Sequence, residues 1–266
     1  MSRLESTFGR LRADHRTGLV TYVTAGDPDL QRSAEILLAL DAAGVDVLEV
    51  GVPFSDPVAD GPVIQRASER ALRQGMTLVG VLQMIADLRA KLAAPVVLFS
   101  YVNPILRMGV DPFARAAAAA GVDGVLALDL PADEAGELRD RLGEEGVDTI
   151  FVLSPTSTVG RIARAAALGR GFLYGVSRLG VTGARAQLAE AARPLVERIR
   201  AVSALPVAVG FGVSRPEHVR EIGTFADAAV VGSALVSVVE EAAGRDDLAA
   251  RVSERARWLM GSAVNG

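Results

Sequence analysis

The stretch LEVGVPFSDPVADGP, residues 48–62, carries carboxylates on both sides of a turn rich in Gly and Pro. Glu49 falls near the end of a short β-branched apolar run, so it is expected where a buried strand leaves the core. Desolvation there should raise its pKa toward neutrality, where one carboxyl can both take and return a proton. Asp60 lies in the loop and should stay ionised, able to accept a hydrogen bond or to face a developing positive charge.

These acids also have structural alternatives. Glu49 could form an ion pair with a nearby Arg, and Asp60 could cap the helix that is expected to begin at Pro62. Asp56 lies in the same loop and could take the place of Asp60. Loop composition alone does not choose between these two aspartates.

Glycine-rich turns follow two later apolar runs, VGFGVS at 209–214 and VGSA at 231–234. Small residues let backbone N–H groups converge, and a helix that starts just after such a turn adds a favourable dipole for an anion. The alternative is that the glycines only permit tight turns, but two such turns favour a phosphate site.

A third glycine-punctuated segment, 177–187, contains Thr182 and Gly183. A polar loop of this kind is expected either to close over a bound phosphate ester or to be a flexible connection, and sequence alone does not separate the two.

The counts of lysine, cysteine and histidine restrict the types of reaction that this chain can catalyse. Lys91 is the single lysine, no cysteine occurs, and the two histidines, His15 and His218, are not in ligand spacing with each other. Lys91 precedes an apolar strand pattern instead of following one, so a Schiff base has no well-placed amine. We interpret the histidines as surface or capping residues and expect neither a metal nor a cofactor.

The chain has 266 residues, of which 50% are apolar and 5% aromatic, so Ala, Val and Leu are expected to build layers of helix on sheet. A net charge of −4 without a basic stripe argues against a nucleic-acid partner and favours small molecules or proteins. No apolar run is long enough to span a membrane, and the first sixteen residues are too charged for a signal peptide. A cytoplasmic location is the prediction.

Apolar, β-branched runs alternate with helical patterns along the whole chain. Eight strands are predicted at 19–24, 45–50, 95–100, 124–129, 148–153, 171–177, 206–210 and 228–232. Helices are predicted at 30–43, 62–74, 78–92, 111–120, 132–145, 158–168, 186–203, 215–222, 233–243 and 247–260.

This alternation predicts parallel strands closed into a single (β/α)₈ TIM-barrel domain over residues 1–266, with a doubly wound open sheet as the rival. Leu4, Phe8 and Leu11 share one face of an extra N-terminal helix. Active sites of such barrels lie at the C-terminal ends of the strands. Glu49, Tyr101 and the two glycine-rich turns all fall at such ends.

Several longer motifs resemble the tryptophan synthase alpha chain family over nearly the whole chain. LEVGVPFSDPVADGPVIQ is similar to the segment that carries the catalytic Glu and Asp of that family, which puts these roles on Glu49 and Asp60. The other matching motifs are TYVTAGDP at 21–28, YVNP at 101–104, DLP at 129–131, SPTST at 154–158, SRLGVTGAR from Ser177, PVAVGFGVSRPEHV at 206–219 and VVGSALV at 230–236.

The resemblance implies a lyase that cleaves indole-3-glycerol phosphate, a small phosphate ester, to indole and glyceraldehyde 3-phosphate by a retro-aldol reaction. Glu49 would shuttle protons, and Asp60 would accept from the indole N–H. Gly183, Phe211, Gly212, Gly232 and Ser233 would hold the phosphate, and Thr182 would be a further substrate contact. The family pattern also assigns substrate contacts to Tyr22, Tyr101, Tyr174 and Phe211, with Leu126 or Leu128 walling the indole and Tyr174 near Glu49.

The family further implies an α₂β₂ complex with a tryptophan synthase beta chain, docked on the loop 53–60 and the face near 103–106. A stand-alone indole-releasing lyase is the closest alternative. A phosphosugar isomerase or epimerase would share the phosphate glycines, and a non-catalytic interaction protein would not depend on the carboxylates.

Overall fold

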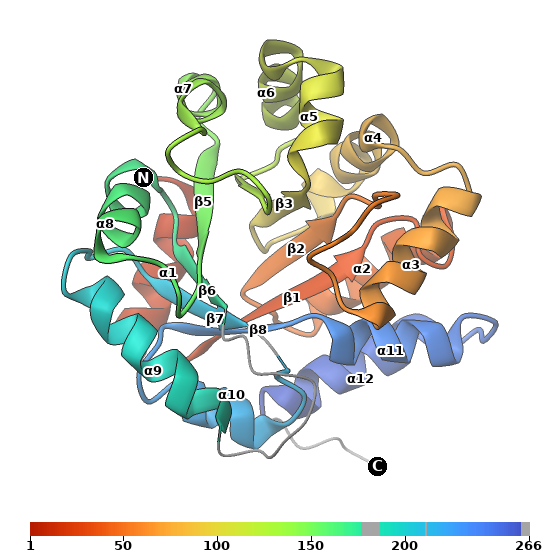
Figure 1. The fold of residues 1–266 in the computed structure, drawn as a ribbon. Helices are drawn as coiled ribbons and strands as arrows, with labels where there is room; N and C mark the ends of the chain where they lie inside the picture. The colour runs from red at the N-terminus through yellow and green to blue at the C-terminus, as the bar shows by residue number, and fades with distance from the viewer. Residues whose placement is uncertain (177–186, 211, 262–266) are drawn as a thin grey trace.

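Eight parallel strands close into one barrel in the order of the sequence (Figure 1). The computed structural model describes residues 1–176, 187–210 and 212–261, with the backbone alone for 187–191. The strands are β1 (Gly18–Thr24), β2 (Val47–Gly51), β3 (Val96–Ser100), β4 (Gly124–Ala127), β5 (Asp148–Leu153), β6 (Leu173–Val176), β7 (Val207–Gly210) and β8 (Ala228–Val231). The predicted TIM barrel is confirmed, and the open sheet is wrong because β1 pairs with β8.

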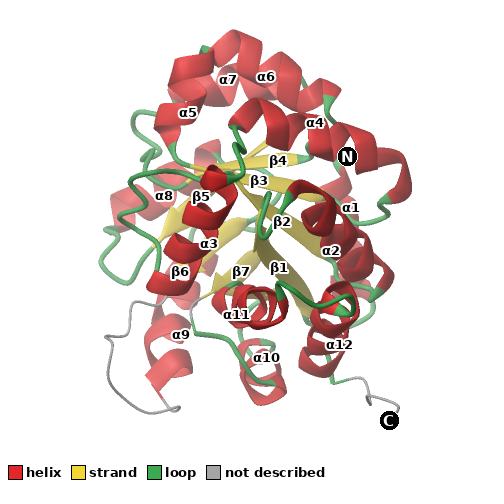
Figure 2. Cartoon of the chain, turned by 90° about the vertical axis from the view of Figure 1, so that its right-hand side faces the viewer, coloured by secondary structure: helices red, strands yellow, loops and turns green. Residues whose placement is uncertain are grey.

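Helices surround the barrel on its outer side (Figure 2). They are α1 (Arg3–Ala13), α2 (Leu30–Ala42), α3 (Pro62–Arg73), α4 (Leu78–Leu88), α5 (Val102–Met108), α6 (Val110–Ala119), α7 (Gly136–Glu144), α8 (Val159–Leu168), α9 (Gln187–Arg200), α10 (Pro216–Ile222), α11 (Ser233–Ala242) and α12 (Leu248–Leu259), with a 3₁₀ turn at Arg89–Lys91. Helix α5 was not predicted. It has only seven residues and a proline in its first turn, so it shows little helical periodicity.

Side chains alternate between the two faces of each strand, as the pleat requires. On β2, Leu48 and Val50 join the core between strands and helices, whereas Val47 belongs to the apolar cluster inside the barrel. Glu49 shares the inward parity of Val47. Because side chains alternate along a strand, the side chain of Glu49 points into the barrel.

Helix α1 closes the N-terminal end of the barrel. Ser2 and Glu5 form a capping box at its start. Leu4, Phe8 and Leu11 pack against the interior cluster of the barrel, and the rings of Phe8 and Phe172 are 5.3 Å apart between centroids. The predicted N-terminal helix is confirmed, and it leaves the functional residues at the opposite end.

A partly buried ion-pair network joins the helices that follow β2 and β8. Arg70 on α3 donates from Nε and Nη2 to the two carboxylate oxygens of Asp27 at 2.7 and 2.9 Å, and from Nη1 to Glu240 on α11 at 2.8 Å. The side chain of Asp27 is only 2% exposed. Arg66 makes a second pair with Glu240, at 2.7 Å, on a more exposed surface. Arg70 thus links the loop after β1 to both helices.

Replacing Arg70 with Met should lower the free energy of unfolding by about 3 kcal/mol, because it leaves the Asp27 carboxylate buried without its partner. Urea unfolding followed by circular dichroism measures the loss. Arg66→Met is the control. It removes an exposed pair on the same glutamate and should cause a much smaller change. If both variants lowered the free energy of unfolding equally, the burial of Asp27 would not be the cause of the loss.

Within the described part of the chain, no helix is both long and apolar enough to cross a membrane.

Candidate active site

Glu49 lies inside the barrel, deeper than the sequence predicts. It is the third of the five residues of β2, beside Tyr22 of β1 and Val97 of β3, and it is 1% exposed. Neither carboxylate oxygen has a hydrogen-bond partner among the residues that the structure describes, so the ion pair considered as its alternative is not found there. Burial alone raises the pKa of Glu49 to about 8. At neutral pH this side chain is therefore mostly a neutral acid.

Asp60 faces the same cavity from the loop before α3. The Tyr101 hydroxyl donates to Asp60 Oδ2 at 3.3 Å, and it accepts from the backbone N–H of Ala59 at 3.0 Å. Burial raises the pKa of Asp60 to about 6, while the hydrogen bond from Tyr101 acts in the opposite direction. Asp60 is therefore largely ionised at neutral pH. Its side chain does not cap α3, whose N-cap residue is Gly61.

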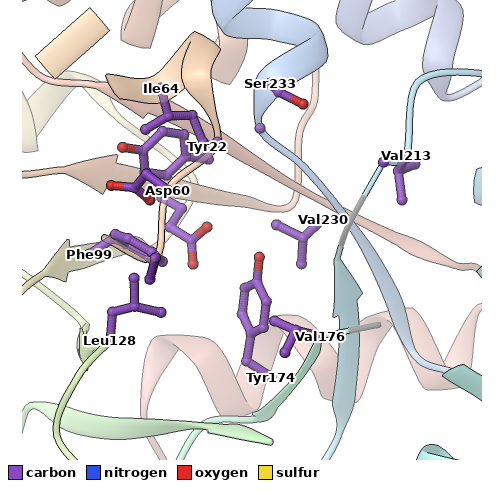
Figure 3. Close-up of a pocket in the computed structure, with 15 residues that line it drawn as sticks. Tyr22, Asp60, Ile64, Phe99, Leu128, Tyr174, Val176, Val213, Val230 and Ser233 are labelled. Atoms are coloured by element: carbon purple, nitrogen blue, oxygen red, sulfur yellow. The ribbon is translucent and has the colours of Figure 1, made fainter. Parts of the chain in front are cut away.

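One side of the cavity is an apolar wall. Tyr22 and Phe99 pack edge to face with their ring centroids 5.2 Å apart, and Leu128 and Val176 continue the lining. Figure 3 shows the hydroxyl of Tyr174 pointing into the cavity from below. The cavity has a volume of about 180 Å³. It provides an apolar space beside the two carboxyl groups.

Two glycines make room for the tyrosine hydroxyls in this wall. A Cβ on Gly51 would lie 2.2 Å from the Tyr22 hydroxyl oxygen, and one on Gly210 would lie 2.6 Å from that of Tyr174. Both distances are too short for a real contact, so these strand positions accept no larger residue without displacing the tyrosines. Gly210 of β7 therefore shapes the apolar wall.

The opposite side of the cavity is built from the turns after β7 and β8. Gly212 has φ +69°, a conformation that favours glycine, and Gly232 is the N-cap residue of α11. Ser233 begins that helix, whose first N–H groups have no intrahelical partner. Figure 3 shows Ser233 and Val213 across the cavity from Asp60. This side can therefore bind an anion while the other side handles protons.

Most of the predicted site residues meet at this cavity. The lining contains Tyr22, Glu49, Asp60, Tyr174, Gly212, Gly232 and Ser233. Tyr101 does not line it and instead holds Asp60. Leu128 lines it, whereas Leu126 belongs to the cluster packed against α1. Thr182, Gly183, Phe211 and the segment 177–186 lie outside the described residues.

Sequence reasoning missed several lining residues. Phe99 has the inward parity of β3, so a period-two reading of that strand could have found it. Ile64 lies in the first turn of α3 and Val230 on β8, where they face the cavity (Figure 3). No local signal in the sequence shows that the first turn of α3 turns inward, because that depends on the loop before it.

A closed parallel barrel in which a buried carboxyl group and a loop carboxyl group, both of raised pKa, share one cavity with a glycine-rich helix start is typical of an acid–base enzyme of the TIM-barrel class. The sequence model of the tryptophan synthase alpha chain matches residues 8–264. The chain belongs to this family, as its motifs predict.

Relatives cover nearly the full chain. It is 47% identical over 252 residues to the tryptophan synthase alpha chain of Geotalea uraniireducens, covering 95% of this chain and 94% of the relative. It is 48% identical to that of Geotalea daltonii, covering 92% and 93%. A solved structure of Mycobacterium tuberculosis tryptophan synthase superposes with a TM-score of 0.89 at 41% identity, covering 98% and 97%.

Proposed function

We propose that this chain cleaves indole-3-glycerol phosphate to indole and glyceraldehyde 3-phosphate, as the alpha subunit of a tryptophan synthase. The observation that carries the proposal is the shared apolar cavity. It places a neutral buried acid and an ionised carboxylate on one side and the start of α11 on the other. The indole fits the apolar wall, and the phosphate fits the glycine-rich side.

Glu49 carries out the proton transfers in this proposal. As the neutral acid it gives its proton to C3 of the indole, and as the resulting carboxylate it takes the proton of the C3′ hydroxyl. The C3–C3′ bond then breaks, its electrons return to the indole ring, and the C3′ oxygen becomes the carbonyl of glyceraldehyde 3-phosphate. Glu49 ends protonated, as it began. A carboxyl with a pKa near neutrality serves both steps.

Asp60 stabilises the intermediate between these two steps. Protonation at C3 makes the indole ring a positively charged indolenine, and an ionised carboxylate that accepts from the ring N–H lowers the energy of that cation. Tyr101 keeps Asp60 in place by its hydrogen bond and by stacking on Phe54 at 4.9 Å between ring centroids. The apolar wall strengthens the attraction by excluding water.

Assay of the purified chain for indole and glyceraldehyde 3-phosphate tests the proposal. We expect the two products in equal amounts from indole-3-glycerol phosphate. Full turnover without any beta chain would favour the stand-alone lyase. No indole, together with conversion of a phosphosugar, would favour the isomerase or epimerase and overturn the proposal. We also propose that the reaction takes place in the cytoplasm. Fractionation of the cells should then recover the indole-releasing activity in the cytoplasmic fraction.

We also propose that the chain pairs with a tryptophan synthase beta chain in an α₂β₂ assembly. A solved Pyrococcus furiosus structure of a tryptophan synthase α₂β₂ complex superposes with a TM-score of 0.86 at 40% identity, covering 92% of this chain and 98% of that one. On this chain, Val58 is 86% exposed and Leu106 is 57% exposed, in the two segments that the family resemblance assigns to the partner. Their exposure leaves both side chains available for contact with a partner.

Size-exclusion chromatography with a family beta chain tests this pairing. Val58→Asp and Leu106→Asp should each weaken complex formation at least about tenfold, because they place a charge in an apolar contact. Val202→Asp is the control, since Val202 is also exposed but lies in neither segment. Complex formation that is unchanged in the first two variants would contradict the proposed surface.

A further inference from the structure

The turn after β7, on the phosphate side of the cavity, is bound by a side chain of α12, a helix distant in sequence. Ser214 follows Gly212 and Val213, which both line the cavity. Its carbonyl oxygen accepts from Nη2 of Arg255, on α12, at 2.9 Å. Its N–H donates to Nδ1 of His218, on α10, at 3.3 Å. Both backbone groups of Ser214 are thus bound by side chains from other elements.

The guanidinium of Arg255 is itself fixed in place. Its central carbon lies 4.3 Å from the centroid of the Trp258 ring, in a cation–π contact one helical turn along α12. The neighbouring residues Val252 and Ala256 are fully buried in the core, so the backbone of α12 is anchored at this point. Arg255 therefore presents a donor of defined position to the turn after β7.

The position of this turn matters because it shapes the anion side of the cavity. Val213 is 3% exposed and Gly212 has a positive φ, so residues 212–214 have a defined conformation where they lead into α10. Losing the bond at the Ser214 carbonyl frees the turn at the residue next to Val213. Backbone N–H groups bind an anion well only when they are held in the right direction before it arrives.

We propose that Arg255 is a positioning residue that holds the turn 212–214 in the conformation that receives the phosphate group of the substrate. Arg255 does not line the cavity, and it acts through the Ser214 carbonyl. The proposal rests on the proposed function for the identity of the ester. The effect on anion binding does not depend on whether the carboxylates then cleave that ester.

Calorimetric titration with sn-glycerol 3-phosphate and, separately, with indole tests the proposal on the full chain. Arg255→Met should weaken glycerol phosphate binding about tenfold, the loss expected for one hydrogen bond from a charged donor, and leave indole binding within about twofold. Arg255→Lys keeps a charged donor and should recover most of the affinity. Arg251→Met is the control, because it removes an exposed ion pair with Asp247 from the same helix. It should change the affinity for neither ligand.

Kinetics give a second, independent readout. If the chain cleaves indole-3-glycerol phosphate, Arg255→Met should raise KM about tenfold and leave kcat within about twofold. Equal loss of glycerol phosphate and indole binding would show that Arg255 only stabilises the fold, and unchanged glycerol phosphate binding would also overturn the proposal. Failure of the proposed function looks different: the wild-type chain would then release no indole, although the titrations would still report on Arg255.

Discussion

Glu49→Gln should lower kcat for indole release by about 10³-fold, with KM changed by less than about threefold. At neutral pH Glu49 is mostly protonated, since burial raises its pKa to about 8. Glutamine therefore matches the shape and charge of the resting side chain and lacks only the transferable proton. Steady-state kinetics with indole-3-glycerol phosphate measures both constants.

The stability of the same variant is its control. Neither oxygen of Glu49 has a hydrogen-bond partner among the described residues, so the substitution breaks no contact there. The midpoint of urea unfolding should stay the same or rise, and a lost activity then cannot be ascribed to unfolding. A variant that keeps more than about a tenth of the wild-type kcat would show that another group carries the proton.

Asp60→Asn should lower kcat about 10²-fold or more. The amide keeps the size of the side chain but has no charge to place against the indolenine cation. Tyr101→Phe is the matched comparison, because it removes the hydroxyl that donates to Asp60 Oδ2 and accepts from the N–H of Ala59, and it leaves the charge of Asp60 in place. Its effect should stay within about tenfold, because only two hydrogen bonds of a neutral hydroxyl are lost.

The order of these two variants is the informative result, and the same indole assay measures it. A larger loss for Tyr101→Phe than for Asp60→Asn would mean that loop geometry matters more than charge. An Asp60→Asn variant of full activity would contradict the electrostatic role and return Asp56 to consideration.

Much of this site follows from local patterns in the sequence. The eight strands follow from short apolar runs between helices, and parallel strands put Glu49 and the glycine-rich turns at one end of the barrel. Ser233 could be assigned because a serine directly before an apolar periodic run indicates a helix start, and Gly232 because a small residue beside that start lets an anion approach.

Other features depend on contacts between segments distant in sequence. Tyr101 was expected to touch substrate, but it binds the loop 41 residues earlier that carries Asp60. Arg255 has no sequence signal that links it to Ser214, because the path of α12 over α10 and α11 decides that contact. Glu49 lies deeper than expected because β2 continues to Gly51, where the absence of a side chain makes room for Tyr22.

In the proposed reaction, the neutral form of Glu49 gives the first proton while Asp60 is ionised. With pKa values raised by burial to about 8 for Glu49 and about 6 for Asp60, the active combination is lost above the first value and below the second. The dependence of kcat/KM on pH should therefore be bell-shaped, with a plateau between them. The second ionisation of a phosphate ester, near pH 6, overlaps the acid limb, so the alkaline limb is the diagnostic one.

The most direct measurement is therefore kcat/KM for indole release from pH 6 to 10. A fall with a midpoint close to the pKa of Glu49, about 8, supports the account, and the residual activity of Glu49→Gln should lack that fall. A rate that stays constant or rises through this midpoint would contradict it, because the carboxylate form would then be the one that begins the reaction.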